Sequence, residues 1–232
     1  MLDTALIFSA GRGERLMPYT KDTPKPMVLV NNKPLLEYHL KCLSAIGVKN
    51  VIINLAYLGY KIKHYFGSGQ QFGVNIEYFA EPPGGLETGG TLAMVVRHYN
   101  LSTKLILCLN ADIYTHYIPQ QNLDIHDNCN GHLILVPHAS HLPPGNFGLS
   151  TTNNLILPHS TEYIFSGIAY YKTKSLLQLP IGRHSLRDWI FAQIAAKKLT
   201  GEVYSGFWQD IGTPAALKNI NYCGFVVTSS CG

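Results

Sequence analysis

A short apolar run that ends in a glycine-containing loop constrains the fold of this 232-residue chain more than any other feature. Residues 5–8 read Ala-Leu-Ile-Phe, and the loop through residues 11–27 begins with glycines and carries prolines in its second half. An apolar run that breaks into glycines predicts a buried strand that enters a loop. Open α/β sheets bind ligands at the carboxyl ends of their strands, so we expect a ligand site at this loop.

The loop combines backbone freedom with positive charge. Gly11 and Gly13 allow positive φ and close approach to a ligand, so that successive N–H groups can point at one anion. Prolines at positions 18, 24 and 26 stiffen the second half, and Lys25 between two of them is a pre-oriented cation. The other basic side chains of the loop are Arg12, Arg15 and Lys21. The loop therefore predicts a polyphosphate site rather than an ordinary solvated turn.

Two common phosphate-binding motifs are absent from the chain. The dinucleotide fingerprint needs a third glycine, and Leu16 stands in its place. A P-loop needs Gly-Lys-Ser/Thr, whereas residues 84–91 contain Gly-Gly-Thr without the lysine. The first of these absences disfavours a nicotinamide-dependent oxidoreductase.

Strands and helices alternate in the first half of the chain. The hydrophobic pattern predicts strand 5–8, helix 34–46, strand 50–55, helix 58–66, strand 74–79, helix 91–99 and strand 104–109. This alternation is typical of an α/β fold whose mostly parallel sheet has helices on both faces. Further on, we expect strands 132–137, 149–157 and 162–171, helix 186–197, a strand carrying 207–213 after residues 203–204, and a helix from 214. This second half is expected to form an antiparallel extension on the substrate side.

Composition excludes several classes of protein. The net charge of +4 is mild and the basic residues outside the loop are dispersed, which favours small anionic substrates over nucleic acid. No run approaches the roughly 20 apolar residues that span a bilayer, and the N-terminus has no signal-peptide pattern. The five cysteines form no Cys-x-x-Cys pair. We expect a cytoplasmic protein without a membrane partner; its oligomeric state cannot be read from the sequence.

Two aspartates are candidate metal ligands. Asp112 follows strand 104–109, at the sheet edge that carries the glycine loop, and Asp210 lies in Trp-Gln-Asp-Ile-Gly-Thr. Magnesium sites combine one or two carboxylates with substrate phosphates. Each aspartate alone could equally be a turn or cap residue. Residues 87–90, Glu-Thr-Gly-Gly, open a predicted helix whose amides and dipole would face a ligand, although a plain loop-to-helix junction is the alternative.

Two other chemistries find little support. The pair His138-x-x-His141 has no further ligands in register, so loop histidines explain it better than a zinc site. No Gly-x-Ser-x-Gly elbow indicates a serine nucleophile.

The segment Gly-x-Gly-x-Arg at 11–15, followed by Pro-Lys-Pro at 24–26, resembles the signature of the sugar-1-phosphate nucleotidylyltransferases. The resemblance covers residue 4 to about 217. It implies a Rossmann-like nucleotide-diphospho-sugar transferase fold and Mg²⁺ bound by Asp112 and Asp210. Ser9 and Ala111 replace the alanine and glycine that the family more often has there.

The resemblance also implies the binding residues. On the nucleotide side these are Ala10, Gly11, Arg12, Gly13, Glu14, Arg15, Lys25, Asn54, Glu81, Thr88, Gly89 and Gly90. On the sugar side they are Asn146, Gly148, Glu162, Ser166 and Gly167. Our hypothesis assigns Lys25 to the α-phosphate and the sugar phosphate, and Arg15 to the β- and γ-phosphates.

Within that family, the chain is most similar to the short uridylyltransferases that act on N-acetylmuramic acid 1-phosphate in cell-wall recycling. The implied partners are UTP and a sugar 1-phosphate; the alternatives are a mannose- or heptose-1-phosphate guanylyltransferase and a non-catalytic nucleotide-sugar sensor. We expect one domain over residues 1–222, with a nucleotide half at about 1–113, a sugar half at about 114–222 and a tail at 223–232.

Overall fold

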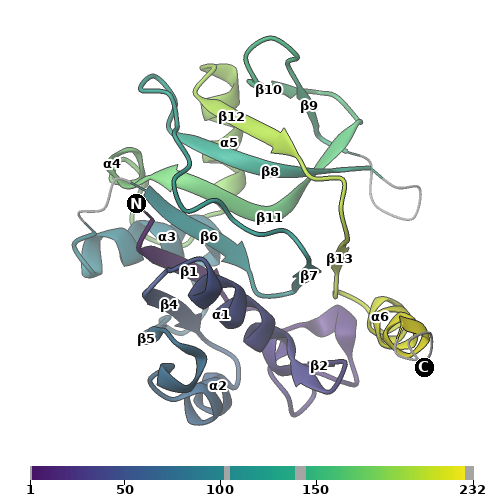
Figure 1. The fold of residues 1–232 in the computed structure, drawn as a ribbon. Helices are drawn as coiled ribbons and strands as arrows, with labels where there is room; N and C mark the ends of the chain where they lie inside the picture. The colour runs from purple at the N-terminus through teal and green to yellow at the C-terminus, as the bar shows by residue number, and fades with distance from the viewer. Residues whose placement is uncertain (1, 102–104, 139–144, 228–232) are drawn as a thin grey trace.

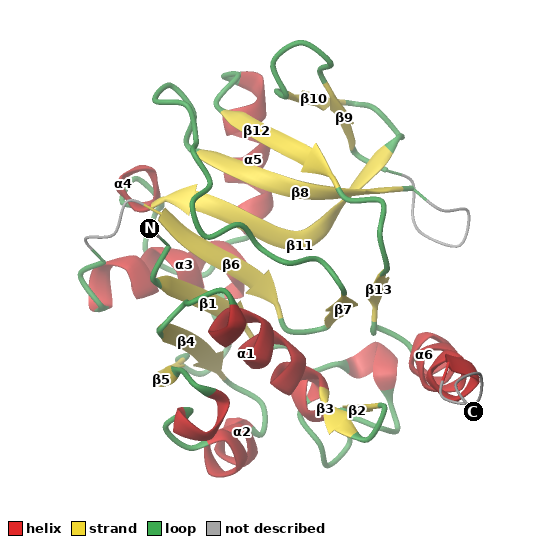
Figure 2. Cartoon of the chain, in the orientation of Figure 1, coloured by secondary structure: helices red, strands yellow, loops and turns green. Residues whose placement is uncertain are grey.

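The computed structural model describes residues 2–101, 105–138 and 145–227 (Figure 1). Within them, the chain forms one nine-stranded sheet flanked by helices (Figure 2). Four strands of the first half are parallel and lie in the order β6, β1, β4, β5. Their bounds are Leu105–Asn110, Thr4–Phe8, Asn50–Leu55 and Asn75–Ala80. The predicted α/β class, with a mixed and mostly parallel sheet, is confirmed.

Alternating side chains of these strands enter two separate cores. Ala5 and Ile7 pack on one face with α1 (Leu35–Ala45) and α2 (Gly59–Phe66). Leu6 packs on the other face with α3 (Glu87–His98) and α5 (Leu186–Ala195). Because successive strand residues point to opposite faces, continuous apolar strands need helices on both sides, as Figure 1 shows.

The second half of the chain extends the same sheet. β11 (Tyr163–Lys172) lies antiparallel between β6 and β8 (Gly131–Pro137), and β12 (Leu199–Val203) pairs with β8 in parallel. The short α4 (Thr173–Leu176) and then α5 connect β11 to β12. The sugar half is therefore continuous with the nucleotide half, and its strands are not antiparallel throughout.

Two strand predictions were wrong in detail. Residues 149–157 do not form one strand, because the polar turn at 151–154 divides β9 (Phe147–Leu149) from β10 (Ile156–Pro158), which pair antiparallel. Residues 207–213 contain only the three-residue β13 (Trp208–Asp210), which follows β12 after a loop. Periodicity locates apolar runs, but short polar turns inside them decide where strands end.

Short elements near the first loop were not predicted from the sequence. They are η1 (Glu14–Leu16), η2 (Lys25–Met27) and the β2–β3 hairpin (Leu29–Val30 and Lys33–Pro34). Farther along the chain, η3 (Gln70–Phe72) and β7 (Ile113–Thr115) were not predicted either. β7 pairs antiparallel with β13. A third apolar cluster packs Leu16 and Val28 of the loop against Ile211 and Leu217. The C-terminal segment thus supports the N-terminal loop.

The last helix, α6, spans Pro214–Val227 and so continues past residue 222, where we place the end of the domain. The domain limits remain a prediction, and residues 228–232 of the expected tail lie outside the described residues. Among the described residues, no helix is both long and apolar enough to cross a bilayer.

Candidate functional site

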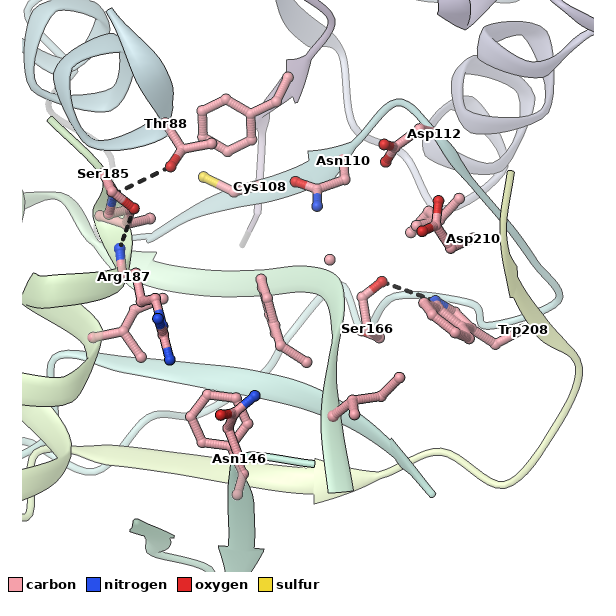
Figure 3. A pocket seen from close by; sticks show the side chains of 18 of the residues that line it. Thr88, Cys108, Asn110, Asp112, Asn146, Ser166, Ser185, Arg187, Trp208 and Asp210 are labelled. Carbon is pink, nitrogen blue, oxygen red and sulfur yellow. Dashed lines mark hydrogen bonds between the residues drawn. The ribbon is translucent and has the colours of Figure 1, made fainter. Parts of the chain in front are cut away.

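A cavity of about 510 Å³ opens at the carboxyl ends of β1 and β6. Figure 3 shows Asp112 and Asp210 at one end and Thr88, Ser185 and Arg187 at the other. The walls come from β6, β11, α5 and β13. The lining residues that the sequence predicted are Arg15, Thr88, Asp112, Asn146, Ser166, Gly167 and Asp210.

Backbone pairing holds the two aspartates together. Asp112 lies two residues after the end of β6 and just before β7, and its carbonyl accepts a hydrogen bond from the N–H of Ile211 at 2.8 Å. β13 ends at Asp210, which is paired in register with Ile113 of β7. The two-stranded β7–β13 sheet therefore brings a residue of the first half next to one near the C-terminus.

The aspartate pair fits a divalent cation. Burial and the neighbouring charge of Asp112 raise the pKa of the Asp210 carboxyl. Its Oδ1 is buried and has no hydrogen-bond partner among the described residues. A Cβ on Gly212 would lie 3.0 Å from both Asp210 oxygens, so glycine leaves this carboxylate room. Two adjacent carboxylates with an unsatisfied oxygen match the ligand chemistry of Mg²⁺.

Two cations contact the aspartates. The Lys25 Nζ lies 2.5 Å from Asp112 Oδ2, and the side chain of Lys25 is only 10% exposed. The Arg15 Nη2 lies 3.9 Å from Asp210 Oδ2 and is solvent-exposed. Lys25 does not line the cavity itself. It pairs with Asp112 from η2, where it stands between Pro24 and Pro26.

The first loop contains one constrained and one unconstrained glycine. Gly13 has φ 68°, and a Cβ there would lie 3.1 Å from Cβ of Lys25. Gly11, contrary to our expectation, does not adopt positive φ, and a Cβ there would meet no atom within 4 Å. The N–H groups of residues 11–13 make no hydrogen bond to the described part of the chain. They are available to an anion.

The other residues of this segment that we expected to bind the nucleotide, Ala10, Arg12 and Glu14, lie outside the cavity lining. Arg12 stacks over the Tyr57 ring at 5.4 Å, and its guanidinium is 3.9 Å from Glu14. Ala10 is half-buried. Nucleotide contacts for Ala10, Arg12 and Glu14 remain proposals.

Asn54 and Glu81 form an internal network. The Asn54 Oδ1 accepts from the N–H of Ser9 at 2.6 Å, and its Nδ2 donates to Glu81 at 2.7 Å. Glu81 also accepts from the Thr91 hydroxyl and from the N–H of Leu86. Asn54 is buried. Through these hydrogen bonds, Asn54 and Glu81 connect the ends of β1, β4 and β5 to the start of α3.

The start of α3 differs from the prediction. The N–H groups of Gly89 and Gly90 both donate to the carbonyl of His184, at 3.0 and 3.1 Å. A Cβ on Gly90 would lie 2.1 Å from the carbonyl oxygen of Gly182. Because these two glycines have no side chain, the loop before α5 can pack directly against the start of α3. Their amides already donate to His184, so they are not free to face a nucleotide as we expected. Thr88 does line the cavity.

On the sugar side, a bulge in β11 shapes the wall. The register of β11 against β8 shifts between Phe165 and Ile168, which places Ser166 and Gly167 in the bulge. Gly167 has φ 85°, and a Cβ there would lie 2.9 Å from Nδ2 of Asn110. The Ser166 carbonyl accepts from the indole N–H of Trp208. Bulges redirect side chains at sites, and this one faces the cavity.

Of the other residues predicted on the sugar side, one lines the cavity and two do not. Asn146 lines the cavity, and its N–H donates to Tyr163. Gly148 lies outside the lining, and a Cβ there would meet Ser160 at 2.9 Å, so packing explains this glycine. Glu162 is exposed and also outside the lining. His138 is described, whereas His141 lies outside the described residues.

Several lining residues were missed by the sequence reasoning. They are Asn110, Cys108, Phe147, Ser185, Arg187 and Phe191. Burial raises the pKa of the Cys108 thiol, so it is a neutral group in the wall. The sequence did contain a signal for Arg187. A cation in the first turn of a helix is unfavourable because it opposes the helix dipole, so an arginine at the start of the predicted helix indicates a role other than helix stability.

A neighbouring histidine adds no charge to the site. His39 of α1 is buried, and burial lowers its pKa to about 4, against the opposing effect of Asp112. The imidazole is therefore neutral at pH 7. The charges at this end of the cavity are those of Asp112, Asp210, Lys25 and Arg15.

Comparison with known proteins gives a consistent result. Residues 4–223 match the model of a family described as nucleotidyl transferase. An N-acetylmuramate α-1-phosphate uridylyltransferase from Neisseria meningitidis is 33% identical over 92% of this chain and 95% of its own length. A mannose-1-phosphate guanylyltransferase from Mycobacterium tuberculosis is 29% identical over 90% of this chain, which spans 61% of that relative.

Solved structures agree on the fold. HddC from Yersinia pseudotuberculosis superposes with a TM-score of 0.77 at 20% identity, covering 96% of this chain and 99% of that one. A CTP:phosphocholine cytidylyltransferase from Streptococcus pneumoniae superposes with a TM-score of 0.75 at 19% identity, covering 96% and 98%. The resemblance and fold expected from the sequence are confirmed.

Proposed function

The chain belongs to the nucleotidyl transferase family, and we propose that it transfers a uridylyl group from UTP to N-acetylmuramic acid 1-phosphate, releasing pyrophosphate. The observation that carries the proposal is the charged cluster at one end of the cavity. Asp112, Asp210 and Arg15 line that end, Lys25 pairs with Asp112 from outside the lining, and Gly13 of the loop lies against Lys25. This arrangement suits a polyphosphate better than any other ligand class.

The reaction needs positioning and charge neutralisation. A sugar phosphate monoester has a second pKa near about 6, so it is mostly dianionic at pH 7 and needs no general base. One of its oxygens forms a bond to the α-phosphorus of UTP, while the bond from that phosphorus to the bridging oxygen breaks and pyrophosphate leaves. Because both reactants are anionic, the protein must offset their repulsion and align them.

The chain's residues supply these two effects. Lys25 offsets charge at the α-phosphate and the incoming phosphate, and Arg15 offsets charge at the β- and γ-phosphates. The amides of residues 11–13 donate to phosphate oxygens. Asp112 and Asp210 would hold Mg²⁺, which neutralises phosphate charge when bound. The cavity beyond Asn110 and the β11 bulge would accept the sugar.

The choice of base and sugar rests on similarity. The uridylyltransferase from Neisseria meningitidis matches nearly its full length to this chain, which supports uridylyl transfer to N-acetylmuramic acid 1-phosphate. The place in cell-wall recycling in the cytoplasm is part of our proposal and follows from the resemblance described in the sequence analysis. The mannose-1-phosphate guanylyltransferase supports the alternative of GTP with mannose 1-phosphate. A non-catalytic sensor is disfavoured, because it would not need Lys25, Asp112 and Asp210 together.

Pyrophosphate release by the purified protein with Mg²⁺ tests the proposal. UTP, GTP, dTTP and CTP are crossed with the 1-phosphates of N-acetylmuramic acid, N-acetylglucosamine, glucose and mannose. We expect preference for UTP with N-acetylmuramic acid 1-phosphate. Preference for GTP with mannose 1-phosphate would support the guanylyltransferase, and no release with any pair, while UTP still binds, would support the sensor.

A further inference from the structure

We propose that Arg187 binds a carboxylate carried by the sugar, so that the cavity selects an acidic sugar 1-phosphate over its uncharged counterpart. The inference rests on the proposed function and adds the residue that reads the sugar. It follows from the place of Arg187 in the cavity, from its lack of an acidic partner and from the apolar surroundings.

Arg187 lies at the end of the cavity away from the phosphate cluster. Figure 3 shows its side chain on the opposite side of the cavity from Asp112 and Asp210. Ser185 caps α5 by accepting from the N–H of Arg187 at 3.1 Å, which fixes where the helix begins. The Arg187 guanidinium carbon then lies 5.1 Å from the centre of the Phe191 ring. The cap and the ring set the direction of this side chain.

The guanidinium makes no ion pair or hydrogen bond with the described part of the chain. Arg15 faces Asp210, and Arg183, four residues before Arg187, is 3.0 Å from Glu87. Only Arg187 among these three has an aromatic face and no carboxylate as its neighbour. Its place in the first turn of α5 also opposes the helix dipole, so helix stability does not account for it.

The surroundings favour a carboxylate over a neutral group. Arg187 is exposed toward solvent, and the apolar side chains nearest to it are Phe191, which stacks on Phe147, and Ile190 on the same helix, all of which line the cavity. A sugar that fills the cavity removes water from the guanidinium. If the sugar is uncharged, the Arg187 guanidinium loses its hydration and gains no anionic partner in exchange, which costs free energy. If the sugar carries a carboxylate, the guanidinium can form two parallel hydrogen bonds in apolar surroundings.

A phosphate is the less suitable occupant of this end. The triphosphate and the sugar phosphate already have cations, amides and the aspartate pair at the opposite end. With its 1-phosphate at the end of the cavity that holds the two aspartates, the sugar ring would extend toward the end that holds Arg187. A carboxylate on the far side of the ring is the substituent that this geometry pairs with Arg187.

The test compares two substrates that differ in one acidic group. N-acetylmuramic acid 1-phosphate carries a carboxylate that N-acetylglucosamine 1-phosphate lacks. We expect Arg187→Gln to lower the ratio of their kcat/KM values, acidic over neutral, by about 10- to 100-fold, mainly through KM for the acidic sugar. Arg187→Lys should restore part of the preference. Arg183→Gln, a matched change four residues earlier and outside the cavity lining, should leave the ratio unchanged.

Binding measured without turnover separates this inference from the proposed function. Calorimetry with each sugar phosphate, on wild type and Arg187→Gln, should show the same loss of preference even if no nucleotide is transferred. An inactive wild type that still binds the acidic sugar through Arg187 would overturn the proposed function alone. Equal losses for both sugars, or an unchanged ratio, would overturn the role of Arg187.

Discussion

Lys25 meets Asp112 through an ammonium group that is almost entirely buried, at 2.5 Å. Such a cation is preorganised, because the protein has already held it away from water before the substrates arrive. The exposed Arg15 is held less firmly, at 3.9 Å from Asp210. At the residue scale, the site therefore depends more on Lys25 than on the other basic side chains of the loop.

Replacing Lys25 with alanine should lower kcat by about 100- to 1000-fold, because the charge that develops on the phosphates loses its fixed partner. Steady-state pyrophosphate release measures this loss, and circular dichroism checks the fold. Lys33→Ala, a change at an exposed lysine of β3, should keep normal turnover. Near-normal turnover of Lys25→Ala would show that our assignment is wrong.

Asp210 should reveal the cation through stability as well as activity. Since burial and Asp112 raise its pKa, the ionised carboxylate is unfavourable in the metal-free fold. Asp210→Asn should therefore not lower the melting temperature in a chelator, and it should abolish the rise that we expect Mg²⁺ to cause in wild type. Thermal unfolding with Mg²⁺ or chelator measures both; Asp188→Asn is the control. A full Mg²⁺ response in Asp210→Asn would exclude it as a ligand.

At the element scale, glycines with different surroundings carry different roles. Gly90 lies inside α3, where helix propensity alone would favour alanine by about 1 kcal/mol. The carbonyl of Gly182 would lie 2.1 Å from the new Cβ, and a backbone atom cannot rotate away. The close contact outweighs the propensity. Gly11 has no such neighbour, so only a ligand could require a glycine there.

We therefore expect Gly90→Ala to destabilise the protein by about 1–2 kcal/mol, because the loop before α5 must move. Gly11→Ala should change the free energy of unfolding by less than about 0.5 kcal/mol. The same Gly11 change should raise KM for the nucleoside triphosphate. Urea unfolding and initial-rate kinetics measure the two effects. A destabilised Gly11→Ala, or a stabilised Gly90→Ala, would contradict this account.

At the scale of the whole molecule, a carboxylate outside the cavity lining connects β12 to β8 and to Tyr117. Glu202 of β12 accepts from the Tyr117 hydroxyl at 2.6 Å and lies 3.7 Å from the imidazole Nε2 of His132 on β8. The His132 imidazole, followed by the Tyr117 hydroxyl, holds the pKa of Glu202 below its usual value, despite partial burial. The ionised carboxylate thus stabilises the half of the sheet that includes β8, β11 and β12.

The pH dependence of this contribution has a definite sign. A carboxyl whose folded pKa is lowered stabilises the fold fully above its unfolded pKa of about 4.3, and this stabilisation is lost as the pH falls through the lower folded pKa. Wild type should therefore melt higher than Glu202→Gln at pH 7, and the difference should shrink below about pH 4. The exposed Glu77→Gln serves as control. A difference that grows on acidification would refute the assignment.

Much of the fold followed from local patterns in the sequence. The apolar run before Gly11, the spacing of the first helices and the strand before Asp112 all depend on neighbours within a few residues, and periodicity reports those. The position of the loop through residues 11–27 was predicted for the same reason, and its binding of phosphate remains a prediction. The turn that divides residues 149–157 was missed, because an apolar pattern does not show where a strand is interrupted. The positive φ expected of Gly11 was wrong, because a glycine permits positive φ but does not require it.

The sequence by itself determined the α/β class, the loop of amides and cations, and the two aspartates as candidate ligands. Only the tertiary structure decided that β13 pairs with β7, which brings Asp210 beside Asp112. It also decided that His184 occupies the amides of Gly89 and Gly90, and that Arg187 enters the cavity. These outcomes depend on contacts between segments distant in the chain, which form only when the whole sheet and its helices pack together.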